Sequence, residues 1–503
     1  MLAKTITSTL VGIDAVLVEV EVDSTSSGFP YYTVVGLPDA TVRESRERII
    51  SACKNSGLKL ASSRITVNLA PAELRKEGGS FDLPIAIGIL LASGVADLPR
   101  VGDYLLSGEL ALDGCLRPVR GALASAVLAR DRGLRGIILP AENAAEALLV
   151  DGVAVLAARH LSEVIAVLSG QAAEISRPDP APAAEDSPVE DFQDVKGQET
   201  AKRAMEIAAA GGHNVLLVGP PGAGKTMLAR RLPSIMPPMC LDEIIECTKI
   251  YSAAGLTDGR GAVRTRPFRA PHHTVSDAGL IGGGGHPKPG EVSLAHNGVL
   301  FLDEFVEFSR AALEGLRQPL EDGIVTISRA QQSLTFPCRF MLVAAVNPCP
   351  CGYFGDPTRT CACTPLQRQK YFGRISGPIL DRIDIQLEVP AVNLKELRAE
   401  RSGEASTAIR QRVRTARDVQ AKRSRTARVN ARLDSRGIKK HCVVDDRIMS
   451  LLDAASRQVG ISARAYNRIL RVSRTIADLE NADHISHHHV AEAIQMRSID
   501  RYL

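Results

Sequence analysis

The stretch GPPGAGKT, from Gly219 to Thr226, has the residue types and spacing of a loop that grips phosphate groups. Its glycines allow backbone N–H groups to turn inward around phosphate oxygens, Lys225 reaches the outer phosphates, and the Thr226 hydroxyl offers a ligand to Mg²⁺. The residues expected to surround the nucleotide are Gly219, Pro220, Pro221, Gly222, Ala223, Gly224, Lys225 and Thr226. The apolar run NVLLV before this stretch and the sequence TMLARRL after it predict the strand and helix that such a loop needs.

Three side chains at the ends of later apolar runs suit the hydrolysis of a bound nucleotide. The run GVLFLDE ends in Asp303, whose carboxylate can hold the water shell of Mg²⁺, and in Glu304, which can polarise an attacking water. The run FMLVAAVN ends in Asn347, which can orient that water near the terminal phosphate. With Lys225 and Thr226, these residues predict a site that hydrolyses ATP, with Mg²⁺ held by Thr226 and Asp303. The alternative for the stretch GPPGAGKT is a simple glycine turn. For Asp303 and Glu304 the alternative is a helix cap, and for Asn347 it is an ordinary turn residue.

Four cysteines lie close together as Cys349, Cys351, Cys361 and Cys363. They form two C-x-C pairs separated by nine residues, in a segment rich in Gly, Pro and Thr that cannot form a core of its own. Four thiolates can close a tetrahedral Zn²⁺ site, and the metal would then order the segment. The inner spacing is shorter than usual for such a site, so four free buried thiols are the alternative. The sequence HISHHHV near the end is interpreted as a polar helix start.

The whole chain must supply the elements that position these groups. At 503 residues it is too long for one hydrophobic core, which predicts two or three domains. Its longest apolar runs are broken by Gly, Ser and Asp well short of a membrane span, so a membrane protein is not expected. The first residues alternate like a strand without a visible secretion signal, and ten cysteines are too few for a disulfide scaffold. We therefore expect a cytoplasmic protein.

The pattern of apolar runs predicts a multidomain α/β protein. Residues 1–170 mix strand-like alternation with helical stretches, which indicates an α+β domain. Residues 171–191, rich in Pro, Ala and acidic side chains, indicate a linker. Residues 192–392 alternate strands with helices, as expected of a parallel sheet with crossover helices. Residues 393–503 hold a basic helical segment and three amphipathic helices that predict a helical lid.

At these residues the chain resembles AAA+ ATPases of the magnesium-chelatase-like clade, and more narrowly the YifB/ComM family. The resemblance covers nearly the whole chain and is carried by FRAPHHTVSDAGLIGGGGHPKPGEVSLAHNGVLFLDE, NPCPCGYFGDPTRTCACTPLQ, SGPILDRIDIQLEVP, VGLPDATVRESRERI and TVNLAPAELRKEGGSFDLPIAIGIL. It implies a ring, usually a homo-hexamer, in which a neighbour's arginine completes each site. Arg382 matches that arginine, Arg374 matches it less well, and Arg464 matches the lid arginine that senses nucleotide. The alternative role of these arginines is a surface salt bridge.

An inserted element with the sequence RAPHHTVSDAGLIGGGGHPKPG lies between the phosphate loop and Asp303. Its flexible glycines, histidines and lysine suit a loop that projects into a central pore and tracks a sugar-phosphate backbone. The candidate DNA contacts are His272, His273 and Lys288, beside His286 and the glycines Gly282 to Gly285. The alternative is that the histidines satisfy buried hydrogen bonds.

The segment from Ile409 to Lys440 carries twelve Lys or Arg residues against two Asp. This imbalance creates a local positive potential although the net charge of the chain is only +4. Contact with DNA, sensitive to salt through counterion release, is one interpretation of the segment. The other is a solvated helix face.

The front domain resembles the protease domain of Lon in EGGSFDLPIAIGILLAS and GCLRPVRGALASAVLARDRGLRGIILPAEN. In that family a serine nucleophile is activated by a lysine. Ser80 lies where the resemblance places the serine, but Leu123 lies where it places the lysine. Peptidase activity is therefore not expected, and the domain is interpreted as a structural or DNA-contacting layer of the ring.

The resemblance implies an ATP-driven motor that moves along single-stranded or branched DNA. Its task would be branch migration or unwinding of recombination intermediates in natural transformation. One competing function is a magnesium-chelatase subunit that drives metal insertion into a porphyrin. The Lon-like domain and the cysteine segment argue against it, so porphyrin is not expected as a partner. A second competitor is a protein-remodelling or regulatory ATPase.

Overall fold

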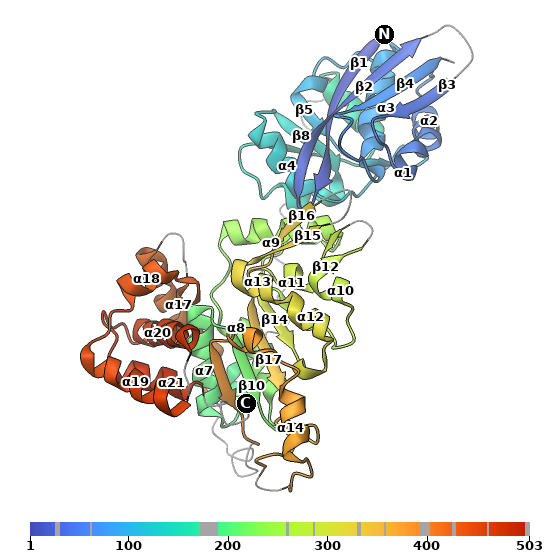
Figure 1. Cartoon of the computed structure of the whole chain (residues 1–503). Coiled ribbons are helices and arrows are strands. Elements are labelled where there is room, and N and C mark those ends of the chain that lie inside the picture. The colour runs from blue at the N-terminus through green and yellow to red at the C-terminus, as the bar shows by residue number, and fades with distance from the viewer. Residues whose placement is uncertain are drawn as a thin grey trace. The chain divides into compact units, whose positions relative to one another are not determined.

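The computed structural model describes residues 1–25, 31–60, 63–171, 190–257, 261–284, 287–328, 333–356, 359–391, 403–424, 429–459 and 462–497. The chain divides into two compact units (Figure 1), unit 1 with Met1–Glu185 and Cys240–Arg264, and unit 2 with Asp186–Met239 and Thr265–Leu503. The predicted linker lies almost wholly outside the described residues, as do Gly285, His286 and part of the basic segment. The mixed α/β class of the chain is confirmed.

Unit 1 is built on a seven-stranded sheet of order β3-β4-β2-β1-β5-β8-β9. The strands are β1 (Leu2–Val11), β2 (Asp14–Thr25), β3 (Tyr31–Val35), β4 (Arg64–Ala70), β5 (Tyr104–Leu106), β8 (Gly136–Pro140) and β9 (Ala154–Ala158). Strands β1 and β2 form an antiparallel hairpin, and β5, β8 and β9 continue from β1 in parallel. Alternation in β2, where Val18, Val20 and Val22 are buried, fixes its register because a one-residue slip would expose all three.

The helices of unit 1 are α1 (Ala40–Arg43), α2 (Ser45–Asn55), α3 (Asp82–Ala92), α4 (Ala122–Asp131), α5 (Ala144–Ala147), α6 (Leu161–Leu168) and α9 (Leu241–Ala254). Helix α3 is buried along almost its whole length, so it reads as a continuous apolar run rather than an amphipathic pattern. Helix α9 belongs to this unit through the 240–264 segment, where Ser252 accepts from the N–H of Gly121 at 3.0 Å. A short pair of strands, β6 (Glu109–Leu110) and β7 (Leu116–Arg117), completes the unit.

Unit 2 contains a five-stranded sheet of order β11-β14-β17-β10-β18 in which every pairing is parallel. The strands are β10 (Val215–Val218), β11 (Phe268–Arg269), β14 (Val299–Leu302), β17 (Met341–Val346) and β18 (Ile385–Glu388). Strands β10, β14 and β17 are buried at every residue, which explains their unbroken apolar sequences. The parallel sheet expected from residues 192–392 is thus present.

Helices and short strands surround this sheet. They are α7 (Glu199–Gly211), α8 (Lys225–Ile235), α10 (Asp277–Ile281), β12 (Gly282–Gly283), β13 (Lys288–Pro289), α11 (Glu291–Leu294), α12 (Arg310–Gly315), α13 (Arg317–Asp322), β15 (Ile324–Ser328), β16 (Ser333–Pro337), α14 (Pro365–Phe372) and α15 (Gly377–Leu380). Two antiparallel strand pairs lie in this part of the chain, β12–β13 in the inserted element and β15–β16 after α13.

The last part of unit 2 is helical, with α17 (Ser406–Arg423), α18 (Ser435–His441), α19 (Asp446–Val459), α20 (Ala463–Leu479) and α21 (His487–Gln495). The Ser462 hydroxyl accepts from the N–H of Ala465 and caps α20. Apolar side chains of α17, α20 and α21 join those of α7 and the sheet in one core. Among the described residues, none of the helices combines the length and the apolarity needed to cross a bilayer.

Candidate functional site

The sheet order of unit 2 brings the predicted catalytic groups to one edge. Strands β14, β17 and β10 are neighbours and parallel, so their carboxyl ends meet. The phosphate loop follows β10, Asp303 follows β14 directly, and Asn347 follows β17 directly. Ligand sites of open parallel sheets form at such carboxyl ends.

The phosphate loop needs its glycines for two different reasons. Gly222 and Gly224 have φ of 78° and 80°, a region that glycine enters without steric cost. Gly219 needs its lack of a side chain, because a Cβ there would lie 2.1 Å from the carbonyl oxygen of Val389. A residue outside the loop also stabilises it, because the Gln198 amide donates a hydrogen bond to the Ala223 carbonyl at 2.5 Å.

Lys225 lies at the centre of the site and is only 7% exposed. Its ammonium donates to the carbonyls of Gly219 at 2.6 Å and Pro220 at 3.0 Å, and to Asn347 Oδ1 at 3.1 Å. Burial lowers the pKa of Lys225 to about 8, against the opposing charge of Asp303. The ammonium is therefore held by its own loop, in a place where phosphate oxygens would relieve the cost of burying it.

The magnesium ligands and the catalytic acid are also brought together. The Thr226 hydroxyl donates to Asp303 Oδ2 at 2.8 Å, which gives the hydroxyl and carboxylate oxygens that Mg²⁺ prefers. Glu304 follows in a left-handed conformation, with φ of 50° and ψ of 44°, and its N–H donates to Asp303 Oδ1 at 2.9 Å. Its side chain is 53% exposed and reaches His273, with Glu304 Oε2 3.0 Å from His273 Nδ1. These residues fit a bound nucleotide with Mg²⁺.

The arginines form a second group. Arg382 donates to the carbonyl of Pro378 at 2.7 Å and pairs with Glu321. Arg464 lies beside it, 3.6 Å from Asp381 and 66% exposed. Burial and then the charges of its neighbours lower the pKa of Arg382, and these neighbours are Arg464, Arg468 and Arg317. Each of these four arginines also has a carboxylate partner, Glu321 for Arg382, Asp381 for Arg464, Asp384 for Arg468 and Glu314 for Arg317.

Arg374, the poorer match to the trans arginine, is placed differently. It is 53% exposed and pairs with Glu307 at 2.9 Å. Glu307 lies in the short helix Phe305–Glu307 that directly follows Glu304. Arg374, Arg382 and Arg464 thus each have an ion pair with a carboxylate, which was the alternative interpretation of all three.

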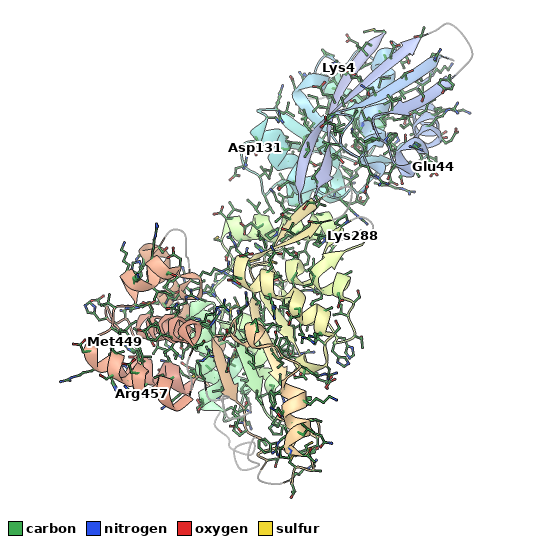
Figure 2. The ribbon with its side chains drawn as sticks, in the orientation of Figure 1. Lys4, Glu44, Asp131, Lys288, Met449 and Arg457 are labelled. Carbon is green, nitrogen blue, oxygen red and sulfur yellow. The ribbon has the colours of Figure 1, made fainter. Side chains whose placement is uncertain are left out.

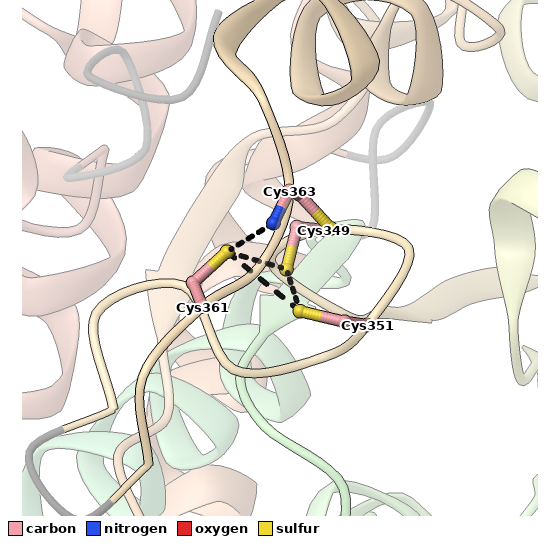
Figure 3. A group of neighbouring side chains, drawn as sticks. All are labelled: Cys349, Cys351, Cys361 and Cys363. Atoms are coloured by element: carbon pink, nitrogen blue, oxygen red, sulfur yellow. Dashed lines mark hydrogen bonds between the residues drawn. The ribbon is translucent and has the colours of Figure 1, made fainter.

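The four cysteines meet in space (Figure 3). Cys349 Sγ lies 3.3 Å from Cys351 Sγ and 3.6 Å from Cys361 Sγ, and all four sulfur atoms lie within 4.8 Å of one another. A tetrahedral Zn²⁺ with bonds of about 2.3 Å would separate its sulfurs by about 3.8 Å, and a disulfide would bring two sulfurs to about 2.05 Å. The arrangement therefore fits Zn²⁺. The N–H of Tyr353 is the main cause that lowers the pKa of Cys351 to about 6.

The cysteine segment lies against the phosphate loop. Gly352 has φ of 84°, and a Cβ there would approach Pro221 Cδ at 2.7 Å. A small cavity is lined by residues of both segments, among them Gly219 and Pro220 of the phosphate loop and Phe354 and Asp356 of the cysteine segment. Order in the cysteine segment therefore also supports the phosphate loop at Pro221.

A second group with metal-ligand atoms lies in the C-terminal helices. Glu480 Oε2 is 2.9 Å from His488 Nε2 and 3.0 Å from His489 Nε2. His489 Nδ1 accepts from the N–H of Ser486 at 3.0 Å, and Ser486 caps α21. Both ring nitrogens of His489 thus have protein partners, so these contacts are satisfied without an ion.

Of the candidate DNA contacts, His272 and Lys288 are exposed and His273 is half-buried. Lys288 is exposed on β13 and is labelled in Figure 2, and His272 is exposed with its Nδ1 2.9 Å from Thr274 Oγ1. His273 is turned instead to Glu304, with its ring 4.1 Å from that of His272 between centroids. This contact was not predicted from the sequence, because no spacing links a loop histidine to a carboxylate on another strand.

The basic segment is divided between structural and exposed side chains. Arg410 donates to the carbonyl of Ser234 at 2.7 Å and Arg417 to that of Ala209 at 2.9 Å, close to the carboxyl ends of α8 and α7. These arginines satisfy helix-end carbonyls, where cations are favoured. The exposed basic side chains that remain among the described residues include Arg414, Lys422, Arg436, Lys439 and Lys440.

In unit 1, Ser80 lies in the short helix Gly79–Phe81 before α3, and Leu123 lies in α4 with no exposed surface. Leu123 is part of an apolar cluster, so the position is used for packing. Lys76, four residues before Ser80, is fully buried, and its ammonium donates to the carbonyl of Pro71.

Comparisons with known proteins cover both units. The profile of magnesium chelatase subunit ChlI matches residues 191–397, that of subunit ChlI of Mg-chelatase matches 18–143, and that of the ChlI C-terminal region matches 403–497. The uncharacterized protein YifB of Salmonella typhimurium is 46% identical, over 99% of this chain and 97% of its own. Competence protein ComM of Haemophilus influenzae is 46% identical, over 98% and 96%.

A shorter similarity concerns a protease. Lon protease 2 of Bacillus subtilis is 30% identical over 24% of this chain and 22% of its own. The full-length identities and the three profiles agree with the parallel sheet and the phosphate loop described above. The chain belongs to the YifB/ComM family, whose members are magnesium-chelatase-like AAA+ proteins, a class of ATPases.

Proposed function

We propose that this chain is the ATP-hydrolysing subunit of a ring that moves along DNA and promotes branch migration or unwinding of recombination intermediates in natural transformation. The observation that carries the ATPase part is the meeting of Lys225 with Asn347 and of Thr226 with Asp303 at adjacent strand ends. The DNA part is supported by the full-length similarity to a protein named Competence protein ComM. ATP and chromosomal DNA are both found in the cytoplasm, where we place the activity.

The residues have separate roles in this proposal. Lys225 and the loop N–H groups bind the outer phosphates, and Thr226 and Asp303 hold Mg²⁺, which supplies charge neutralisation of the phosphates. Glu304 accepts a proton from the attacking water, and Asn347 keeps that water near the terminal phosphate. Lys225 exchanges its carbonyl partners for phosphate oxygens when nucleotide binds.

The ring is proposed because the site needs one more positive group. Arg382 would enter the neighbouring subunit's site, and Arg374 is the less favoured candidate for this role. Arg464 would be the lid arginine that senses nucleotide. Within the single chain, the Arg382 guanidinium is paired with the Glu321 carboxylate. A trans arginine of this kind accelerates phosphoryl transfer by about 10³ to 10⁵. The homo-hexamer follows from the family resemblance.

We propose structural Zn²⁺ at the four cysteines, whose spacing fits it. The metal would supply no chemistry to ATP hydrolysis and would order the segment that lies against Pro221. The exposed DNA-contact candidates are Lys288, His272 and the outward-facing basic side chains of residues 409–440.

A magnesium-chelatase subunit is the second candidate, because the matching profiles carry that name. A third is a protein-remodelling ATPase. ATPase assays with single-stranded DNA, branched DNA, a porphyrin and unfolded protein separate the three, and we expect stimulation by DNA alone. Strand displacement on a synthetic junction should be lost in Lys225→Ala, which cannot bind nucleotide, and in Glu304→Gln, which binds it without hydrolysis. Stimulation by porphyrin or by unfolded protein alone would refute the proposal.

A further inference from the structure

We infer that His273 is a positioning residue for Glu304 and connects the catalytic carboxylate to the inserted element. The inference rests on the proposed ATPase and goes beyond it by assigning a role to a histidine that the sequence had suggested as a DNA contact. Its basis is the distance of 3.0 Å between His273 Nδ1 and Glu304 Oε2.

Hydrogen bonds hold the backbone of Glu304, whereas its side chain extends into partly exposed space. Its N–H donates to Asp303 Oδ1 at 2.9 Å and its carbonyl accepts from the N–H of Glu307 at 2.7 Å. The side chain is 53% exposed and has three rotatable bonds, so solvent alone would leave it in several rotamers. The contact with His273 selects one of them. A catalytic base must be held within hydrogen-bond reach of its water, so this selection bears directly on the rate.

His273 is itself well supported. Its ring lies 4.1 Å from that of His272, with an interplanar angle of 34°, and 6.5 Å from that of Phe308 in an edge contact. Phe308 is 4% exposed and follows Glu304 by four residues. The histidine is only 29% exposed, which suits an internal contact better than a nucleic-acid contact. The ring is thus packed on the same segment whose carboxylate it meets.

The segment that carries His273 continues into the inserted element. Helix α10 begins at Asp277 and leads into the β12–β13 hairpin, which ends with Lys288 and Pro289. The Ser309 hydroxyl donates to Asp277 Oδ1 at 2.7 Å, so the histidine and glutamate segments are joined at a second point. A displacement of the hairpin by a bound strand would therefore reach Glu304 through His273.

The test compares His273→Ala with His273→Asn, which keeps an N–H donor next to Cγ, and with His488→Ala, at an exposed histidine of the C-terminal helices, as the matched control. Loss of the contact leaves Glu304 unpositioned, so His273→Ala should lower kcat about tenfold, less than the ~10² to 10⁴ expected for loss of a general base. KM for ATP and DNA affinity by fluorescence anisotropy should stay unchanged. His273→Asn should recover most of kcat, and His488→Ala should resemble the wild type.

Two further results would overturn the inference. Equal loss of kcat in His273→Ala and His273→Asn would indicate a purely structural role, and loss of DNA affinity with unchanged kcat would restore the DNA-contact interpretation. Adding His273→Ala to Glu304→Gln should cause no further loss, because both act through one carboxylate. If the wild type lacked ATPase activity or Glu304→Gln retained it, the proposed function itself would fail. If those two behaved as expected and His273→Ala matched the wild type, only the inference would fail.

Discussion

Asp384 holds together the strand that follows Arg382, the start of β10 and the helix that carries Arg464. Its side chain is 3% exposed, and that of its partner Arg468 on α20 is 16% exposed. Arg468 donates to Asp384 Oδ1 at 2.5 Å, and the N–H of Asn214 donates to Oδ2 at 3.1 Å. We predict that Asp384→Asn destabilises unit 2, because it leaves a buried guanidinium without its counterion.

The magnitude follows from the burial of the pair. Removing one partner of a buried ion pair costs about 3 to 5 kcal/mol, and the partial exposure of Arg468 favours the lower end, about 3 kcal/mol. For a unit of this size that loss lowers the unfolding midpoint by about 5 °C. The double variant Asp384→Leu with Arg468→Met should lose less than the sum of its single variants, since no unpaired charge stays buried.

The pH dependence of the free energy of unfolding provides a second test of the Asp384–Arg468 ion pair. Burial raises the pKa of Asp384, but the charge of Arg468 and the contact with His213 outweigh it, so the pKa is lowered. A carboxylate with a lowered folded pKa stabilises at pH values above its unfolded pKa of about 3.9 and loses this effect as pH falls. In thermal and urea unfolding, the gap between wild type and Asp384→Asn should be constant from about pH 8 to 5 and shrink below about pH 4. A gap below about 1 kcal/mol at neutral pH, or a double variant as unstable as the sum, would refute the reasoning.

Three further predictions concern the phosphate loop, the cysteines and DNA. Gly219→Ala should abolish nucleotide binding in calorimetry, because its Cβ would meet the carbonyl of Val389, and unchanged affinity would contradict the close approach. Elemental analysis should find about one Zn²⁺ per chain in the wild type and none in Cys361→Ser, and equal metal content would refute the site. Reversing two exposed charges with Lys439→Glu and Lys440→Glu should weaken DNA binding and reduce the salt slope by about two, whereas an unchanged slope would exclude this surface.

Local patterns predicted the parallel sheet and the phosphate loop because both depend on short sequences. The strands before Gly219 and Asp303 are unbroken apolar runs, since parallel strands are buried on both faces. Apolar runs do not show which strands become neighbours in the sheet. The strand order nevertheless decides the chemistry, because it joins Lys225 to Asn347 and Thr226 to Asp303.

Contacts between distant segments could not be predicted in the same way. The run of positive charge around Arg417 suggested a surface for DNA, but charge alone does not show which arginines face a helix end. The pairing of His273 with Glu304 depends on a fold that places two loops together, and no spacing encodes it. The grouping of Cys240–Arg264 with unit 1 was also not visible, because apolar helices read alike whichever unit they join.

A mixture of two inactive variants tests the central claim most directly. Lys225→Ala lacks the phosphate grip and Arg382→Ala lacks the proposed trans arginine, so each alone should show no DNA-stimulated ATPase activity. In mixed rings some interfaces combine an intact Lys225 with an intact Arg382 from the neighbour, and an equal mixture should recover about a quarter of wild-type activity. A mixture as inactive as its components, or full activity of Arg382→Ala alone, would contradict the account.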